Sequence, residues 1–122
     1  MSDLVLEIFD TYQPISLDLR INKKPSVSTF ARGSNIVFSI TSKARYQVPR
    51  VTLASDSVYV SIANPLGATM VYRELATKID SRFVYSYQTI TSQSIGAYQV
   101  SIYSILNDQH YITPPLIGFI LE

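Results

Sequence analysis

Few residues in this chain have the side chains that catalysis commonly uses. The 122 residues contain one histidine, His110, and no cysteine. Asp108 lies two residues before His110 and is close enough in sequence to orient its ring, but no recognisable serine or lysine motif supplies a nucleophile. We therefore expect His110 to be a solvated loop residue rather than a general base, and we predict no enzyme activity and no catalytic residue.

The spacing of residues also gives little support for a metal or phosphate site. One histidine without cysteine leaves too few ligands for zinc, and the four glycines are isolated, so no glycine-rich phosphate loop is present. Calcium loops combine several carboxylates, whereas the loop aspartates here occur singly. Asp56 and Asp80 each precede a predicted strand, where we expect turn hydrogen bonds. The sequence predicts no metal and no cofactor.

Composition argues against nucleic acid, membrane and disorder. Ten Lys and Arg against nine Asp and Glu give a net charge of +1, whereas nucleic-acid binding calls for a basic excess. The apolar runs are shorter than the ~20 residues of a membrane-spanning helix, and the first residues lack the basic region of a secretory signal. A hydrophobic content of 47% predicts one folded domain over residues 1–122, made in a reducing cytoplasm.

Tyrosine is the residue type that suggests binding. The chain has nine tyrosines, and tyrosine offers a large contact area at little entropic cost. It is also a good strand former, and both explanations stay open. The interface candidates at loop, strand-edge or minority-face positions are Tyr46, Tyr72, Tyr103 and Tyr111, together with Arg45 from the basic loops of the first half.

Apolar and polar residues alternate with a period of two along most of the chain, which predicts strands. The predicted strands are Leu4–Phe9, Ile15–Ile21, Asn35–Thr41, Ser57–Ala63, Thr69–Leu75, Arg82–Gln88, Ala97–Leu106 and about Tyr111–Leu121, the last broken by Pro114 and Pro115. Residues 22–34, 42–55 and 88–94 are expected to be connections. A short helix over Arg73–Lys78 is a weaker alternative to a strand end followed by a loop. A strand spacing of roughly ten residues predicts an all-β antiparallel sandwich of about seven to nine strands.

One hairpin is predicted by its turn residues. Asn64, Pro65, Leu66 and Gly67 place proline second and glycine fourth, as a type I turn prefers. Thr69–Leu75 should therefore return beside Ser57–Ala63, with Gly67 as a structural residue.

Both terminal strands are apolar and poor in charge. Exposed sheet edges normally carry charges or proline, so unguarded strands at the two ends of the chain would suit addition to a neighbouring sheet. Alternatively, they pair with each other inside one molecule, and residues 1–26 either extend the sheet or dock on a partner. The interface candidates on these strands are Leu4, Leu6, Ile8, Phe9, Leu116 and Phe119.

Two local patterns resemble strands of immunoglobulin-like sandwich domains. The segment 80–87 is similar to their Asp-x-x-aromatic-x-Tyr strand, and the segment 96–102 is similar to the Gly-x-Tyr-x-Val strand that follows. The resemblance implies that Tyr98 forms a tyrosine corner, in which the hydroxyl bonds back to the backbone, with Gly96 as a structural residue beside it. The cysteine pair and core tryptophan of antibody domains are missing.

From about Val27 to Glu122, the order of strands and turns is similar to small modules of tailed-bacteriophage virions, nearest to the N-terminal domain of the baseplate upper protein family. The resemblance implies a structural protein of the virion that docks onto capsid or tail and baseplate subunits, as capsid decoration or tail adaptor. Its partners would be other virion proteins, in a homo-oligomer or a symmetric array. The resemblance brings no catalytic residues.

A carbohydrate-binding sandwich for attachment to a host surface is the alternative function. Tyr46, Tyr59, Tyr72 and Tyr103 would then stack on sugar faces, with a glycan as the partner. The absence of tryptophan, which is the better stacking surface, counts against this alternative.

Overall fold

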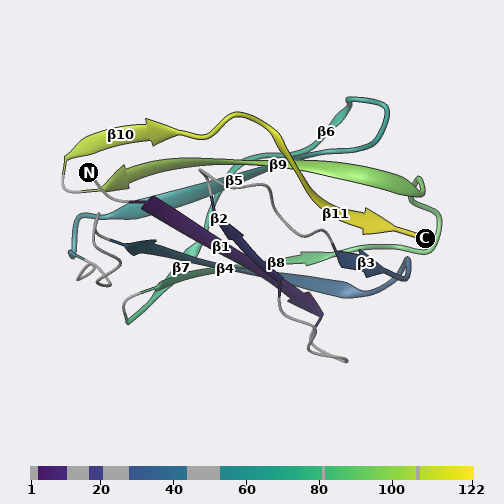
Figure 1. The fold of residues 1–122 in the computed structure, drawn as a ribbon, viewed down its shortest axis with the longest axis horizontal. Helices are drawn as coiled ribbons and strands as arrows, with labels where there is room; N and C mark the ends of the chain where they lie inside the picture. The colour runs from purple at the N-terminus through teal and green to yellow at the C-terminus, as the bar shows by residue number, and fades with distance from the viewer. Residues whose placement is uncertain (1–2, 11–16, 21–27, 44–52, 81, 107) are drawn as a thin grey trace.

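The computed structural model describes residues 3–10, 17–20, 28–43, 53–80, 82–106 and 108–122, with side chains for 29–41 and from 53 onward within those ranges. These residues form an all-β sandwich of two sheets (Figure 1). The part of the chain that the structure describes contains no helix that could cross a membrane. The predicted all-β sandwich is confirmed, and the described strands outnumber the seven to nine that were expected.

Eleven strands are described, of which seven have six residues or more. They are β1 (Asp3–Asp10), β2 (Leu17–Arg20), β3 (Ser28–Phe30), β4 (Asn35–Lys43), β5 (Ser57–Ala63), β6 (Thr69–Leu75), β7 (Thr77–Ile79), β8 (Arg82–Gln88), β9 (Gly96–Leu106), β10 (Gln109–Ile112) and β11 (Leu116–Leu121). The seven long strands all correspond to predicted strands. The strand β3 lies in the segment 22–34 that was expected as a connection, and β7 begins where a loop after a strand end was expected. Three residues are too few to show a period.

The first sheet has the order β2-β1-β4-β8-β7, and the second has the order β3-β11-β9-β5-β6, with β10 also beside β9. All pairs are antiparallel except β3 and β11, which run parallel. Both terminal strands are therefore internal, and they lie in different sheets. The prediction that they are sheet edges, or that they pair with each other, was wrong. Their low charge reflects pairing on both sides, since an internal strand needs no charges that block association.

The core lies between the sheets, where their inner faces meet. The inward residues of β4, β5 and β9 follow the predicted alternation, and the fully buried ones include Ile36, Phe38, Ile40, Val58, Val60 and Tyr98. Phe119 of β11 lies among them, stacked on Tyr98 with ring centroids 5.1 Å apart and edge-on to Phe38 at 6.0 Å.

Phe119 was predicted to be an interface residue, and this was wrong, because its side chain is fully buried. The pairing of β11 with β9 shifts between Ile117 and Phe119, so Gly118 is an extra residue in β11. This β-bulge breaks the period of two. Strict alternation from Leu116, which faces Val100, would have turned Phe119 outward.

The expected hydrogen bond of Tyr98 is confirmed. Its hydroxyl donates to the Ser94 carbonyl oxygen at 2.7 Å. Gln93 Nε2 donates to the hydroxyls of Tyr98 (3.3 Å) and Tyr87 (3.0 Å), which joins the β8–β9 loop to both sheets. Gly96 begins β9 with φ +126°, and a Cβ atom there would lie 3.0 Å from Cγ of Pro65 in the β5–β6 hairpin.

The β5–β6 hairpin has the predicted turn. The Gly67 amide donates to the Asn64 carbonyl oxygen at 2.9 Å, and the Asn64 side chain accepts from the amides of Leu66 and Ala68. Gly67 has φ +89°, but a Cβ atom there would meet nothing within 4 Å. Gly67 and Gly96 therefore both have a positive φ, but only at Gly96 would a Cβ atom meet neighbouring atoms.

We expect Gly67→Ala to lower the free energy of unfolding by about 1–3 kcal/mol, the cost of a positive φ in a residue with Cβ. Gly96→Ala should cost about 1–3 kcal/mol more, because the added methyl group overlaps Pro65. Urea unfolding of both variants measures the difference. Equal losses would mean that the contact between Gly96 and Pro65 does not constrain the hairpin.

The chain crosses from the second sheet to the first at the end of β6. Ala76 is buried between β6 and β7, and its amide donates to the Val58 carbonyl oxygen at 2.8 Å. The Tyr85 hydroxyl of the first sheet donates to Glu74 Oε1 of the second at 2.7 Å. Burial, and then this hydrogen bond, raise the pKa of Tyr85 well above its ordinary value. The segment Arg73–Lys78 is therefore not helical: β6 ends at Leu75, as the favoured strand end predicted, but β7 begins at Thr77, where a loop was expected.

Ionisation of the Tyr85 phenol should lower the free energy of unfolding at alkaline pH. Because its folded pKa lies above the unfolded value of 10.0, its contribution is complete below pH 10 and is lost as the pH rises further. We expect wild type to lose more unfolding free energy between pH 9 and about 11 than Tyr85→Phe, which cannot ionise. The exposed Tyr72→Phe is the control. An identical loss in Tyr85→Phe and wild type would contradict the assignment.

Candidate functional site

The outer face of the second sheet brings together tyrosines from three strands. Tyr59 of β5 and Tyr103 of β9 are cross-strand partners, with ring centroids 5.7 Å apart and planes at 36°. Tyr72 of the neighbouring strand β6 is 70% exposed. Three of the four tyrosines proposed for sugar stacking are thus on one face. The fourth, Tyr46, and its neighbour Arg45 lie outside the described residues.

Arg73 lies between two of these rings. Its guanidinium carbon is 4.4 Å from the ring centroid of Tyr103 and 5.5 Å from that of Tyr72. Both distances are in the range of cation–π interactions. Sequence reasoning missed Arg73, because strict alternation places it on the opposite face from Tyr72.

A β-bulge in β6 explains the position of Arg73. Val60 faces Glu74 and Ile62 faces Val71, so Tyr72 and Arg73 both lie opposite the single residue Ser61. Arg73 has φ +45°, which is uncommon for a residue with a side chain, and its amide donates to Ser61 Oγ at 2.9 Å. The bulge therefore brings two consecutive side chains to the outer face.

His110 extends the cluster. It lies in β10 opposite Ile105, and its Nδ1 shares a hydrogen bond with the Tyr103 hydroxyl. The ring centroids of Tyr103 and His110 are 5.8 Å apart. His110 is exposed as expected, but its placement in a loop was wrong, because Asp108 makes the turn with φ +61° and the strand resumes at Gln109. Tyr103, and not Asp108, contacts the ring.

A shallow groove of about 270 Å³ runs beside the cluster. Small and polar side chains of β5 and β9 form its floor, among them Ser61, Ala63 and Ser101. Tyr72 and Arg73 stand on the β6 side, and the segment from β10 to β11 supplies the other side. The lining residues are Ser61, Ile62, Ala63, Thr69, Val71, Tyr72, Arg73, Gln99, Ser101, Ile102, Tyr103, Ile112 and Pro115. None of them is acidic.

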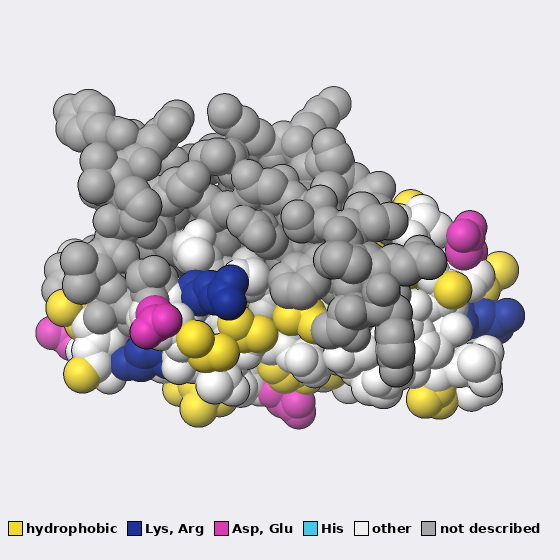
Figure 2. Space-filling view, turned by 90° about the horizontal axis from the view of Figure 1, so that it is seen from below, with side chains coloured by type: hydrophobic (Ala, Val, Ile, Leu, Met, Phe, Trp, Pro, Cys, Tyr) yellow, Lys and Arg dark blue, Asp and Glu magenta, His cyan; other side chains and the backbone are white. Residues whose placement is uncertain are grey.

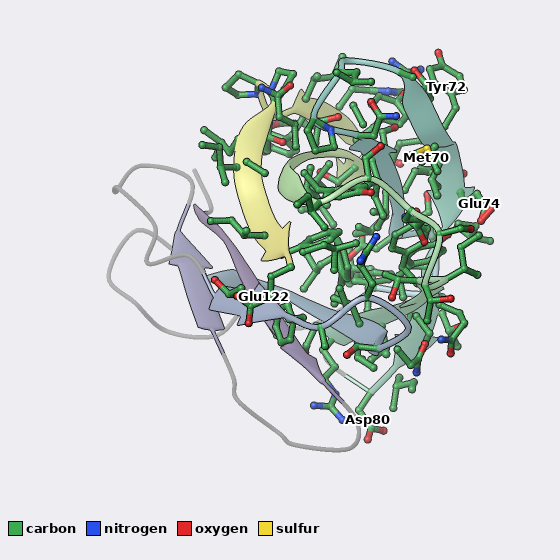
Figure 3. All side chains as sticks on the ribbon, turned by 90° about the vertical axis from the view of Figure 1, so that its right-hand side faces the viewer. Met70, Tyr72, Glu74, Asp80 and Glu122 are labelled. Atoms are coloured by element: carbon green, nitrogen blue, oxygen red, sulfur yellow. The ribbon has the colours of Figure 1, made fainter. Side chains whose placement is uncertain are left out.

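Strand β6 and the hairpin turn before it carry a row of exposed apolar side chains. We call Leu66, Met70, Tyr72 and Leu75 the β6 ridge; their exposed fractions are 86%, 43%, 70% and 62%. Figure 3 shows Met70, Tyr72 and Glu74 on this edge strand, with Tyr72 uppermost and Glu74 lowest in that view. Seen from below in Figure 2, the described charged side chains of both signs are scattered rather than gathered.

The remaining candidates lie apart from the cluster. Tyr111 is half-buried against the core, and Leu116 is also half-buried. The side chains of Leu4, Leu6, Ile8 and Phe9 lie outside the described residues, although their strand is internal. Asp56 makes the expected turn hydrogen bond, accepting from the Leu53 amide at 2.9 Å, and Asp80 occupies the turn after β7 with φ +53°.

No protein-family model matches the chain, and no curated protein matches it. Within the described ranges, no three His, Asp or Glu side chains gather as metal ligands would. The site is therefore interpreted from its own geometry, which is that of a binding surface: aromatic rings, one cation and a polar floor.

The contact between Arg73 and Tyr103 should be measurable in a double-mutant cycle. We expect Arg73→Gln and Tyr103→Leu to couple by about 0.5–1 kcal/mol in unfolding free energy, the range for an exposed cation–π pair. Arg73→Gln paired with Tyr111→Leu is the control and should be additive to about 0.5 kcal/mol. The same coupling in both cycles would contradict a specific contact.

Proposed function

We propose that the chain is a non-enzymatic structural protein of a tailed-bacteriophage virion, which docks in several copies onto capsid or tail and baseplate subunits. The observation that carries the proposal is the β6 ridge. Monomeric proteins seldom expose large contiguous apolar patches, and such patches mark interaction sites. Here four apolar side chains follow one another on a hairpin and its edge strand, all more than 40% exposed.

The arrangement of strands supports an immunoglobulin-like sandwich as the scaffold. Such domains have the strand order A-B-E-D in one sheet and G-F-C in the other, and variable types add a further strand beside C. The orders β1-β4-β8-β7 and β11-β9-β5-β6 follow the same sequence of neighbours. Tyr98, whose hydroxyl donates to the Ser94 carbonyl oxygen, lies near the start of β9. This strand corresponds to strand F, near the start of which such domains carry the tyrosine corner.

Docking would use side chains rather than strand addition. The pairing of β6 with β5 shifts register twice, and Arg73 departs from strand geometry. An edge with bulges is a poor template for a further strand. A partner subunit would therefore cover the ridge, with Leu66 at the hairpin tip and Leu75 at the far end as its outer contacts. In this proposal the β6 ridge takes the docking role that the sequence analysis gave to the terminal strands, because both terminal strands are internal.

Gold labelling of phage particles with antibodies against the purified chain tests the proposal. We expect labelled capsids or tails in electron micrographs. Particles that carry no label, in a lysate that contains the protein, would contradict a virion role.

Sedimentation of the purified protein with particles that lack it tests the ridge. The double variant Leu66→Ser, Leu75→Ser should remain in the supernatant, at least tenfold depleted from particles, because it removes exposed apolar contact area. Ile90→Ser removes an apolar side chain of the β8–β9 loop that is 57% exposed, close to the 62% of Leu75, and should bind as wild type does. Retained binding of the double variant would mean that the ridge is not the docking surface.

A further inference from the structure

We infer that the groove on the outer face of the second sheet binds an acidic saccharide, with the sugar carboxylate at Arg73 and a sugar ring against the exposed face of Tyr72. This binding site does not depend on the proposed virion role. It rests on the charge of the groove, on the hydroxyl and amide groups among its lining residues, and on its size.

The charge of the groove is positive and uncompensated. Arg73 is the only charged residue that lines it, and no Asp or Glu in the described part of the chain forms an ion pair with Arg73. The guanidinium carbon lies over the rings of Tyr103 and Tyr72, and a guanidinium carries its five N–H donors in its own plane. That geometry suits a carboxylate, which accepts two parallel hydrogen bonds from arginine.

The floor of the groove suits hydroxyl groups. Ser101 and Thr69 carry hydroxyls that both donate and accept, and Gln99 carries an amide that does the same. Sugar hydroxyls also donate and accept hydrogen bonds, so they need closely spaced partners that do both. Tyr72 adds an apolar surface at the rim, since 70% of its side chain is exposed. Together these residues fit a ligand with one carboxylate, several hydroxyls and an apolar ring face.

The size of the groove and the pairing of the strands beneath it favour a saccharide over an extended peptide as its ligand. A volume of about 270 Å³ is at the lower end of ligand pockets, so it accommodates one small ring unit of a longer chain. An extended peptide is commonly held by main-chain hydrogen bonds to a free sheet edge. The floor strands β5 and β9 are both paired on both sides, so they have no edge to offer.

Amide NMR titration with trigalacturonate, and with neutral maltotriose as the matched probe, tests the inference. We expect shifts at Ser61, Ser101 and Tyr103, and an affinity at least about tenfold higher for trigalacturonate, as a charge-assisted hydrogen bond allows. Added salt should weaken binding of trigalacturonate only. Equal affinity for both sugars, or shifts elsewhere alone, would overturn the inference.

Three variants make the test specific. Arg73→Gln should lose about tenfold in affinity for trigalacturonate, whereas Arg82→Gln, an exposed arginine of the first sheet, should lose nothing. Gln99→Glu keeps the shape of an exposed side chain and adds a carboxylate to the groove, so it should weaken binding even if Arg73→Gln folds poorly. Unchanged affinity in Gln99→Glu, or tighter binding of a glutamate-rich peptide at the same amides, would overturn the assignment to a saccharide.

The ridge variant separates this inference from the virion role. The double variant Leu66→Ser, Leu75→Ser leaves every residue that lines the groove in place. It should bind trigalacturonate as wild type does while it fails to bind particles. Loss of both activities in that variant would mean that one surface serves both, and would overturn a separate saccharide site.

Discussion

The packing of Phe119 between the two sheets is the interaction on which the other features depend. Its ring stacks on Tyr98 of the same sheet and meets Phe38 of the other edge-on, so it fills the space where the inner faces come together. With Tyr98 held in this way, its hydroxyl reaches the Ser94 backbone and orders the loop before β9. That loop brings Gly96 against Pro65, which places the hairpin that begins β6. A series of contacts thus joins the core to the surface strand that carries both candidate binding surfaces.

Two of the three register shifts in the second sheet have structural consequences of the same kind. The extra residue Gly118 in β11 turns Phe119 inward, and the extra residue in β6 brings Tyr72 and Arg73 to the same outer face. A bulge changes which face a side chain occupies without changing the sheet around it. The bulge in β11 places Phe119 in the core, and the bulge in β6 places Tyr72 and Arg73 in the aromatic and cationic cluster. The second also breaks up the edge of β6, which leaves its side chains available while discouraging strand addition.

The two surfaces on β6 differ in chemistry although they adjoin. The ridge presents aliphatic side chains at the edge, where a protein subunit would remove them from water. The groove presents a guanidinium against two tyrosine rings, together with hydroxyl and amide groups, where a polar anionic ligand would gain directed hydrogen bonds. Tyr72 belongs to both, because its ring stands on the rim between them. An arrangement in which a virion protein is anchored at one surface and exposes the other to solvent is consistent with both proposals.

The sequence alone determined the inner faces of the long strands, because a period of two is a local property that neighbouring residues specify together. Val58, Val60, Ile62 and Tyr98 are buried as the alternation predicts, and the turn at Asn64–Gly67 forms from its own residue types. It also placed Tyr59 and Tyr103 each on the side of its own strand opposite the inward residues, whereas their meeting on one face depends on the pairing of β5 with β9. Tertiary structure alone decided the position of β1 and β11 inside the sheets, the burial of Phe119 and the place of Arg73 beside Tyr103. Each of these depends on which distant strand supplies the hydrogen-bonding partner and in what register, and no local pattern of residues encodes that choice.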